Sequence, residues 1–156
     1  MQGLEREEAF MRAALEYAVA SGKENEVPVG AVIVKDEKII AFGQNRREQG
    51  KNALYHAEIE AIDRACKLLG GWRLWQCELF VTLEPCAMCA GAIVNARIPR
   101  VIFGAYDHKA GACGSVIDVF SSSVYHKPEV IKGVLEQECS KQLSAFFRRL
   151  RQTKSK

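Results

Sequence analysis

The spacing of apolar residues along the chain predicts four helices. Residues 5–21 carry apolar side chains three and four positions apart, which is typical of an amphipathic helix, and glycine at position 22 suits its end. Residues 56–69 repeat this spacing and close at a pair of glycines. Pro85 is expected to open a third helix that runs through residue 96, and residues 136–152 form the last one.

Between these helices, runs of β-branched and aromatic residues predict strands. Residues 27–34 and 38–43 flank a polar turn and are expected to form a hairpin. Residues 78–83 and 100–105 follow as further strands, and 129–135 as a final one. The alternation of strand and helix favours parallel pairing in the later part. The expected architecture is one α/β domain over residues 1–156, in which helices cover both faces of a mixed sheet.

The composition favours a folded cytoplasmic protein. Apolar residues make up 48% and charged residues 26% of the 156, which is ordinary for a globular domain and excludes a disordered chain. There is no apolar run of about 18 residues to cross a membrane, and charges within the first twenty residues argue against a secretory signal. The six cysteines are therefore expected to be reduced thiols.

The C-terminal segment is strongly basic. No acidic residue follows Glu138, whereas six basic residues do: Lys141, Arg148, Arg149, Arg151, Lys154 and Lys156. Such a tail often does no more than keep a surface solvated. The alternative is a surface that meets a phosphate-rich partner.

Two short motifs carry the candidate chemistry, and both fall at predicted helix starts. His56 and Glu58 lie in YHAEI, and Cys86 and Cys89 lie in PCAMC. Cysteines three residues apart share one face of a helical turn, so their sulfurs can both reach one tetrahedral ion at about 2.3 Å. His56 supplies a third ligand from the other helix. A fourth position left open for water is typical of catalytic zinc, and Glu58 is then placed to take the proton of that water.

Each motif alone has a simpler interpretation. A histidine and a glutamate two apart often form a charge pair at a helix start. A lone CxxC pair is also found in redox proteins and as half of a structural zinc site, although no second pair completes four ligands here. Together and in this order they match the H-x-E and P-C-x-x-C signature of zinc nucleobase deaminases.

The resemblance extends over most of the chain. From about residue 10 to residue 151 the sequence resembles the bacterial tRNA-specific adenosine deaminases of the cytidine deaminase-like superfamily. The stretches that carry it are VPVGAVIV (27–34), HAEIEAI (56–62), LFVTLEPCAMCAGAI (79–93), GAYDHKAG (104–111) and LSAFFRRLR (143–151). The metal motifs are shared by the whole superfamily. The GAYDHKAG and LSAFFRRLR stretches are more specific to the tRNA branch.

That resemblance implies a three-layer α/β/α fold with a five-stranded mixed sheet, and hydrolytic conversion of the wobble adenosine, position 34 of an arginine tRNA, to inosine. It implies one Zn²⁺ per subunit on His56, Cys86 and Cys89, with Glu58 moving protons while C6 of adenine is attacked. Asn45 is expected to hydrogen-bond the flipped base. The residues expected to shape the base pocket are Val29, Ala57, Leu83 and Pro85. Those expected to meet the anticodon arm are Asp107, Lys109, Phe146, Phe147 and Arg149.

Adjacent positions such as Phe146 and Phe147 cannot face the same side of a helix, so one of them belongs to the core. The family also implies a homodimer. Two rival functions remain open from sequence: a deaminase of a free base or nucleoside (guanine, cytidine or deoxycytidylate), and a zinc-stabilised RNA-binding or redox protein without catalysis. The basic terminal helix argues against the first, and Glu58 argues against the second.

Overall fold

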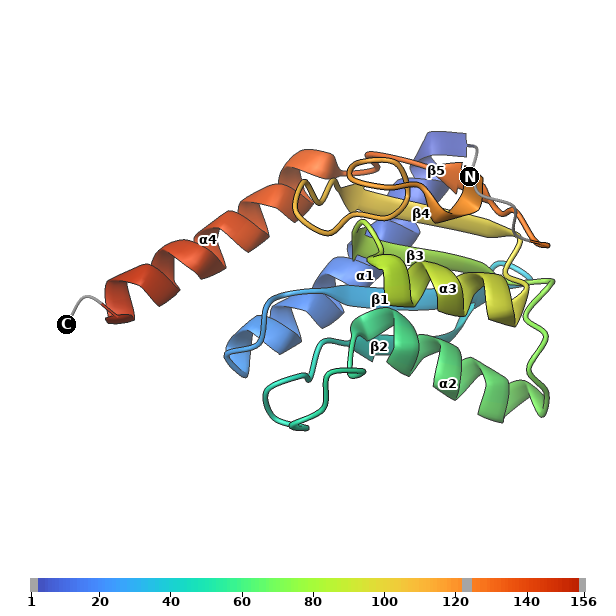
Figure 1. Ribbon diagram of the computed structural model, residues 1–156, viewed down its shortest axis with the longest axis horizontal. Coiled ribbons are helices and arrows are strands. Elements are labelled where there is room, and N and C mark those ends of the chain that lie inside the picture. The colour runs from blue at the N-terminus through green and yellow to red at the C-terminus, as the bar shows by residue number, and fades with distance from the viewer. Residues whose placement is uncertain (1–2, 122–124, 155–156) are drawn as a thin grey trace.

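A computed structural model describes residues 3–121 and 125–154 of the chain. It contains one five-stranded sheet, four α-helices and a 3₁₀ turn within those residues (Figure 1). The helices are α1 (Gly3–Lys23), α2 (Ala57–Leu69), α3 (Ala87–Ala96) and α4 (Glu136–Lys154). The strands are β1 (Gly30–Lys35), β2 (Lys38–Gln44), β3 (Glu78–Leu83), β4 (Arg100–Ala105) and β5 (Glu129–Ile131).

The sheet is mixed, with the strand order β2-β1-β3-β4-β5. The hairpin strands β1 and β2 pair antiparallel, and so do β1 and β3, whereas β3, β4 and β5 run parallel. This confirms the expected mixed sheet. In the parallel pair, Leu83 at the end of β3 lies beside Ala105 at the end of β4. The segments that follow these two strands therefore leave the sheet at the same edge.

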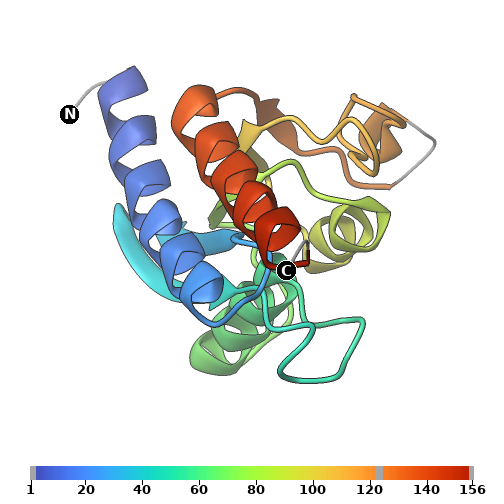
Figure 2. The ribbon, with the colours of Figure 1, turned by 90° about the vertical axis from the view of Figure 1, so that its left-hand side faces the viewer.

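Helices cover both faces of the sheet, as the pattern predicts. Because side chains alternate along a strand, Ile33 and Leu79 face α2 and α3, while Val32 and Phe80 face α1 and α4. Figure 2 shows α1 and α4 side by side on one face of the sheet. None of the described helices is long and apolar enough to cross a membrane.

The close contact between α2 and the sheet depends on a glycine. A Cβ built on Gly43, in β2, would lie 2.0 Å from the carbonyl oxygen of Ala57. Only a residue without a side chain allows the first turn of α2 to rest on the strand at this point. The start of α2 is thereby fixed against the sheet.

Several predicted boundaries are wrong by a few residues. The first strand begins at Gly30 and not at residue 27, and α1 extends to Lys23. The last strand is shorter than expected and ends at Ile131, because Gly133 and Leu135 have φ values of 77° and 53°. Those left-handed conformations turn the chain out of the sheet and into α4.

Candidate metal and base-binding site

The two sequence motifs meet where α2 and α3 begin. His56 is the residue that caps the N-terminus of α2, and Cys86 caps α3. Helix α2 thus starts one residue after its predicted start at His56, and α3 starts two residues after its predicted start at Pro85. Neither side chain makes a capping hydrogen bond to its own helix, so both can turn towards a shared site. Cys89 lies one turn into α3 and is buried.

The geometry of these three residues fits a tetrahedral metal. The Nδ1 atom of His56 lies 3.6 Å from Sγ of Cys86 and 3.5 Å from Sγ of Cys89. A nitrogen and a sulfur bound to one zinc at about 2.0 and 2.3 Å lie roughly 3.5–3.6 Å apart. The three ligand atoms all lie within 4.8 Å of one another. The donor set of one imidazole and two sulfurs is also one that zinc prefers.

The electrostatics favour the metal-binding form of one sulfur, that of Cys86, whereas the hydrogen bond with Cys86 raises the pKa of Cys89. The hydrogen bond with the Cys89 thiol, together with that to His56, lowers the pKa of Cys86 to about 3. The positive end of the α3 dipole acts in the same direction. Cys86 is therefore a thiolate at neutral pH, which is the state that binds a metal.

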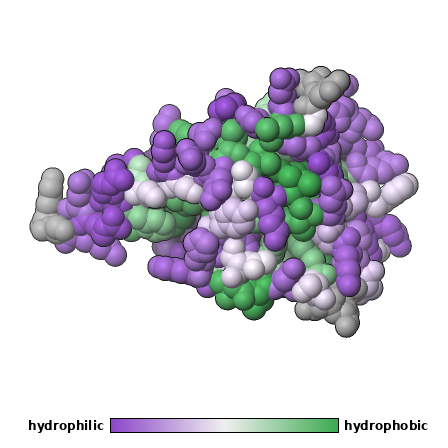
Figure 3. Space-filling model, turned by 90° about the horizontal axis from the view of Figure 1, so that it is seen from above, coloured by the Kyte–Doolittle hydropathy of each residue, from purple (hydrophilic) through white to green (hydrophobic). Residues whose placement is uncertain are grey.

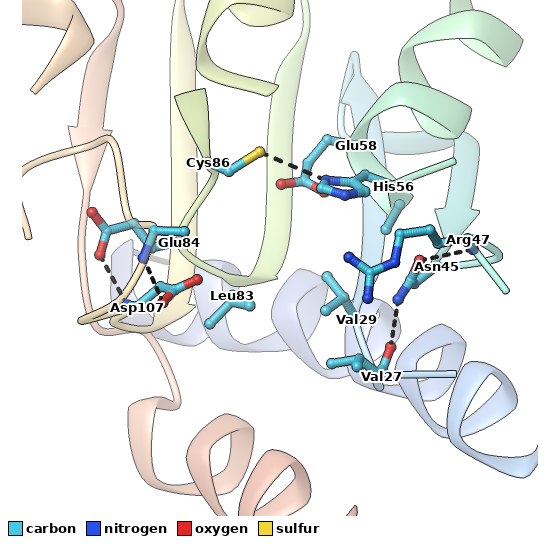
Figure 4. Close-up of a pocket in the computed structure, with 12 residues that line it drawn as sticks. Val27, Val29, Asn45, Arg47, His56, Glu58, Leu83, Glu84, Cys86 and Asp107 are labelled. Atoms are coloured by element: carbon cyan, nitrogen blue, oxygen red, sulfur yellow. Dashed lines mark hydrogen bonds between the residues drawn. The ribbon is translucent and has the colours of Figure 1, made fainter. Parts of the chain in front are cut away.

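Glu58 lies beside this cluster in the first turn of α2. Its side chain is only 4% exposed, and burial raises its pKa to about 7. A carboxyl group with that pKa can both take and give a proton near neutral pH. In Figure 4, Glu58 lies next to His56 and Cys86 at one end of the pocket.

The pocket itself has a volume of about 210 Å³. This is below the roughly 300–1,000 Å³ typical of pockets for drug-sized molecules, so it suits a single heterocyclic base. Twelve residues line it: Val27, Val29, Asn45, Arg47, His56, Ala57, Glu58, Leu83, Glu84, Cys86, Asp107 and Ala110. The cavity thus joins the cluster to six other predicted site residues, which are Val29, Asn45, Ala57, Glu58, Leu83 and Asp107.

Asn45 lies at the opposite end of the pocket from Cys86 (Figure 4). Its Oδ1 accepts the backbone N–H of Arg47 at 3.1 Å, and its Nδ2 donates to the carbonyl of Val27 at 3.2 Å. A side-chain amide has two N–H donors. The second donor is therefore available to a base, while the first two bonds hold the side chain in place.

Two of the pocket's charged residues were missed by sequence reasoning. Arg47 belongs to the polar segment after β2, where sequence gives no sign of which side chain turns inward. Glu84 precedes the P-C-x-x-C motif and reads as an ordinary strand end, yet it is 2% exposed. An acidic residue directly before the motif, at the end of an apolar strand, was the signal that could have identified it.

The residues predicted to meet RNA are divided between two places. Asp107 reaches the pocket, whereas Lys109 is exposed on the same loop. On α4, Phe146 is 6% and Phe147 41% exposed, which identifies Phe146 as the core residue. Both rings line a neighbouring hollow of about 290 Å³ that shares Val27, Asn45 and Arg47 with the pocket. Arg149 is exposed on α4.

Of the remaining predicted residues, Pro85 and Cys89 are buried behind the pocket and do not line it. Pro85 fixes the backbone between Glu84 and Cys86, and its carbonyl accepts the N–H of Ala112 at 2.9 Å. Its contribution to the pocket is therefore made through the main chain.

Comparison with known proteins gives three results. The MafB19-like deaminase family matches residues 5–151. A tRNA-specific adenosine deaminase from Bacillus subtilis (strain 168) is 47% identical over 150 residues, 96% of this chain and 93% of that protein. A solved structure from studies of A-to-I editing by tRNA:A34 deaminases is 44% identical, with a TM-score of 0.83 over 86% of this chain and 98% of that one.

The same fold also occurs in a guanine deaminase from Bacillus subtilis. Its structure is 33% identical, with a TM-score of 0.62, and covers 93% of each chain. These likenesses confirm the expected three-layer deaminase fold. The likeness to the tRNA:A34 deaminase is the stronger in both identity and TM-score.

Proposed function

The chain belongs to the MafB19-like deaminase family, and from that premise we propose that it converts the wobble adenosine of an arginine tRNA to inosine by hydrolysis. Relatives named tRNA-specific adenosine deaminase, 43–47% identical over most of the chain, support this reaction. The observation that carries the proposal is the buried Glu58 carboxyl, which lies beside three metal-ligand side chains at the end of a base-sized pocket.

His56, Cys86 and Cys89 are the residues that would hold zinc. The distances from Nδ1 of His56 and the chemistry of the three side chains support zinc as that ion. When bound, zinc would supply the acidity that makes a water molecule nucleophilic at neutral pH.

Glu58 is the proton carrier of the proposed reaction. Its carboxylate takes a proton from the attacking water and delivers it to N1 of adenine. It then delivers the second proton of that water to the departing amino group, which leaves C6 as ammonia while the oxygen remains on the base. Because burial brings the pKa of Glu58 to about 7, this carboxyl group can both take up and release a proton near neutral pH.

The other pocket residues hold the base in position. The available N–H of Asn45 donates to an acceptor atom of the purine, and the apolar side chains of Val29, Leu83 and Ala57 cover its faces. Extruding a base from RNA costs a few kcal/mol, and a snug apolar pocket offsets that cost. A pocket of this size also excludes bulk water from the reacting atoms.

The anticodon arm would lie over the pocket mouth and along α4. The terminal helix carries Phe147 and Arg149 as exposed residues, and its projecting end is largely hydrophilic in Figure 3. An exposed ring next to guanidinium groups is suited to stacked bases and phosphates. Asp107 and Lys109 approach the RNA from the other side of the pocket, and Phe146 supports Phe147 from beneath, with ring centroids 5.5 Å apart.

The likeness to a guanine deaminase keeps a free base as the second candidate substrate. A free-base enzyme gains nothing from a basic, aromatic terminal helix, which is why RNA is preferred here. The homodimer implied by the family resemblance and the cytoplasmic location expected from the sequence also stand as predictions. Sedimentation of the purified protein tests the first of these.

The test is an inosine assay on an arginine tRNA transcript that carries adenosine at the wobble position. Inosine is read as an A-to-G change on reverse transcription, and free guanine and cytidine are assayed in parallel for released ammonia. Glu58→Ala is expected to abolish inosine formation while retaining zinc. Asp63→Ala, which removes an exposed acid from the same helix, is the matched control and is expected to stay active.

The outcomes separate the candidates. Inosine only at the wobble position, absent in Glu58→Ala, supports the proposal. Ammonia from guanine without inosine in tRNA transfers the function to free bases. An unimpaired Glu58→Ala enzyme contradicts the role of the glutamate.

A further inference from the structure

A second buried carboxylate, that of Glu84, lies in the wall of the pocket at the end of β3. It accepts the backbone N–H of Asp107 at 3.1 Å through Oε1, and those of Cys113 and Ser115 at 3.0 and 3.1 Å through Oε2. The hydroxyl of Ser115 donates a fourth hydrogen bond to Oε1. Figure 4 shows Glu84 and Asp107 joined at the side of the pocket opposite Asn45.

These four bonds replace the hydration that burial removes from the Glu84 carboxylate. A charge that is nearly fully buried is tolerated only where hydrogen bonds replace its hydration. Here the donors all come from one loop, residues 106–115.

This 106–115 loop is folded tightly around the carboxylate. Within it, Oδ1 of Asp107 accepts the N–H groups of Lys109 and Ala110 at 3.0 and 3.1 Å. A Cβ on Gly111 would lie 2.5 and 2.6 Å from the Cδ and Oε1 atoms of Glu84. The loop therefore has no room to shift towards Glu84, and four hydrogen bonds keep it from shifting away.

Glu84 also belongs to the segment that carries a metal ligand. It immediately precedes Pro85 and Cys86, and its own N–H donates to the carbonyl of Ala105 at 2.8 Å. One side chain thus ties the turn before α3 to the loop that places Asp107 and Ala110 in the pocket wall.

We propose that Glu84 is a positioning residue, which fixes the 106–115 loop in the place where it receives the RNA substrate. This inference rests on the proposed function. Because the loop forms part of the pocket wall and supplies no group to the proton transfers, its correct placement contributes equally to binding before and during the reaction. Loss of such uniform binding raises KM and leaves kcat unchanged.

The test uses Glu84→Gln in the full-length, zinc-loaded protein. The amide keeps the shape of the side chain, but its nitrogen cannot accept hydrogen bonds and would face N–H donors. KM for the tRNA transcript is expected to rise about tenfold, with kcat within about twofold of the wild type and zinc content unchanged. Amide hydrogen exchange of Asp107, Cys113 and Ser115 is expected to accelerate, while amides in α1 stay protected.

Two further variants separate positioning from general destabilisation. Gly111→Ala displaces the loop from its own side and leaves Glu84 intact, and it is expected to raise KM in the same way. Glu78→Gln removes a carboxylate at the other end of β3, where it pairs with Arg6 and Arg100. It is expected to lower stability without changing KM.

The result that supports the inference is faster exchange of the three loop amides together with raised KM in both Glu84→Gln and Gly111→Ala. Unchanged exchange in Glu84→Gln overturns it, whether or not the protein acts on RNA, because exchange needs no substrate. Faster exchange with an unchanged KM overturns it as well. If Glu84→Gln lost zinc and Gly111→Ala kept a wild-type KM, Glu84 would act by supporting the turn that carries Cys86. The inference would then be wrong.

Discussion

At the scale of single residues, the molecule contains two kinds of cysteine close to the pocket. Cys86 is kept as a thiolate by its neighbours, whereas burial raises the pKa of Cys113 to about 12 and keeps it a neutral thiol. Cys113 lies in the 106–115 loop near the pocket but makes no part of the three-residue cluster. The convergence of Cys86 and Cys89 on His56, and not the residue type, decides which sulfurs can bind a metal.

We therefore predict opposite results for two Cys→Ser variants. Cys89→Ser is expected to lower zinc affinity more than about a hundredfold, because a hydroxyl is a far weaker zinc ligand than a thiolate. Cys113→Ser is expected to retain one zinc per chain and to lose about 1–3 kcal/mol of stability from burying a hydroxyl. Metal analysis after dialysis against a competing chelator measures both, and full zinc retention by Cys89→Ser would contradict its assignment as a ligand.

Asn45 permits a similarly specific test. Asn45→Asp keeps the oxygen that accepts the Arg47 N–H but removes the nitrogen that donates to the Val27 carbonyl and that we propose donates to the base. Losing a hydrogen bond to the substrate is expected to lower kcat/KM about ten- to a hundredfold. Asn52→Asp is the matched control, because Asn52 caps a turn in the same segment through its oxygen alone. Equal inosine formation by both variants would exclude Asn45 from base binding.

At the scale of elements, the neighbouring rings of Phe146 and Phe147 on α4 have different environments. Phe146 packs inward, while Phe147 is 41% exposed beside the hollow that adjoins the pocket. Phe147→Ala is expected to weaken tRNA binding by about 1–3 kcal/mol, the usual value of one stacked base. Phe146→Ala is expected to cost about 3–5 kcal/mol of unfolding free energy instead. Filter binding and thermal unfolding distinguish the two, and tRNA binding unaffected by Phe147→Ala would rule out stacking on that ring.

The elements themselves were largely predictable because their signals are local. Among the described residues, apolar spacing predicted the four helices. Runs of β-branched and aromatic residues predicted the five strands. The ends were less predictable: β5 stops at Ile131 because Gly133 and Leu135 adopt left-handed conformations. Leucine rarely takes that conformation, so its presence depends on the surrounding tertiary packing and leaves no mark in the sequence.

At the scale of the whole molecule, the metal-ligand cluster could be predicted but the pocket wall could not. His56 lies at the start of one helix, and Cys86 and Cys89 lie at the start of another. Both motifs are visible in the sequence, and the resemblance to a family implies that they form one site. Arg47 and Glu84 enter the pocket through loop conformations that depend on distant partners. Glu26, for example, is fully buried and accepts the N–H groups of Glu48 and Gln49, which shapes the segment that carries Arg47.

Away from the pocket, a cluster of ion pairs joins α1 to the far end of the sheet. Glu78 at the start of β3 binds both Arg6 and Arg100, and Arg6 also pairs with Glu37 at 2.7 Å. Arg100 pairs in turn with Glu7 at 3.0 Å. The cluster therefore ties α1 and the β1–β2 turn to β3 and β4, which are far apart in sequence.

This cluster predicts how stability depends on pH. Partial burial would raise the pKa of Glu78, but its two arginine partners outweigh burial and lower the pKa below the usual 4.5. Below that pH the unfolded chain binds the proton more readily than the folded protein, so stability is present above about pH 4.5 and is lost as pH falls through the lower, folded-state value.

The comparison of wild type with Glu78→Gln isolates that contribution. At pH 7 the free energy of unfolding of the variant is expected to be about 1–3 kcal/mol lower than that of the wild type, because two arginines lose a charged partner. Below pH 4.5 the gap is expected to narrow, since the wild-type carboxylate becomes protonated while the amide does not titrate. Urea unfolding at a series of pH values measures it. A gap that stayed constant down to pH 2.5 would mean that shape, and not charge, makes Glu78 stabilising.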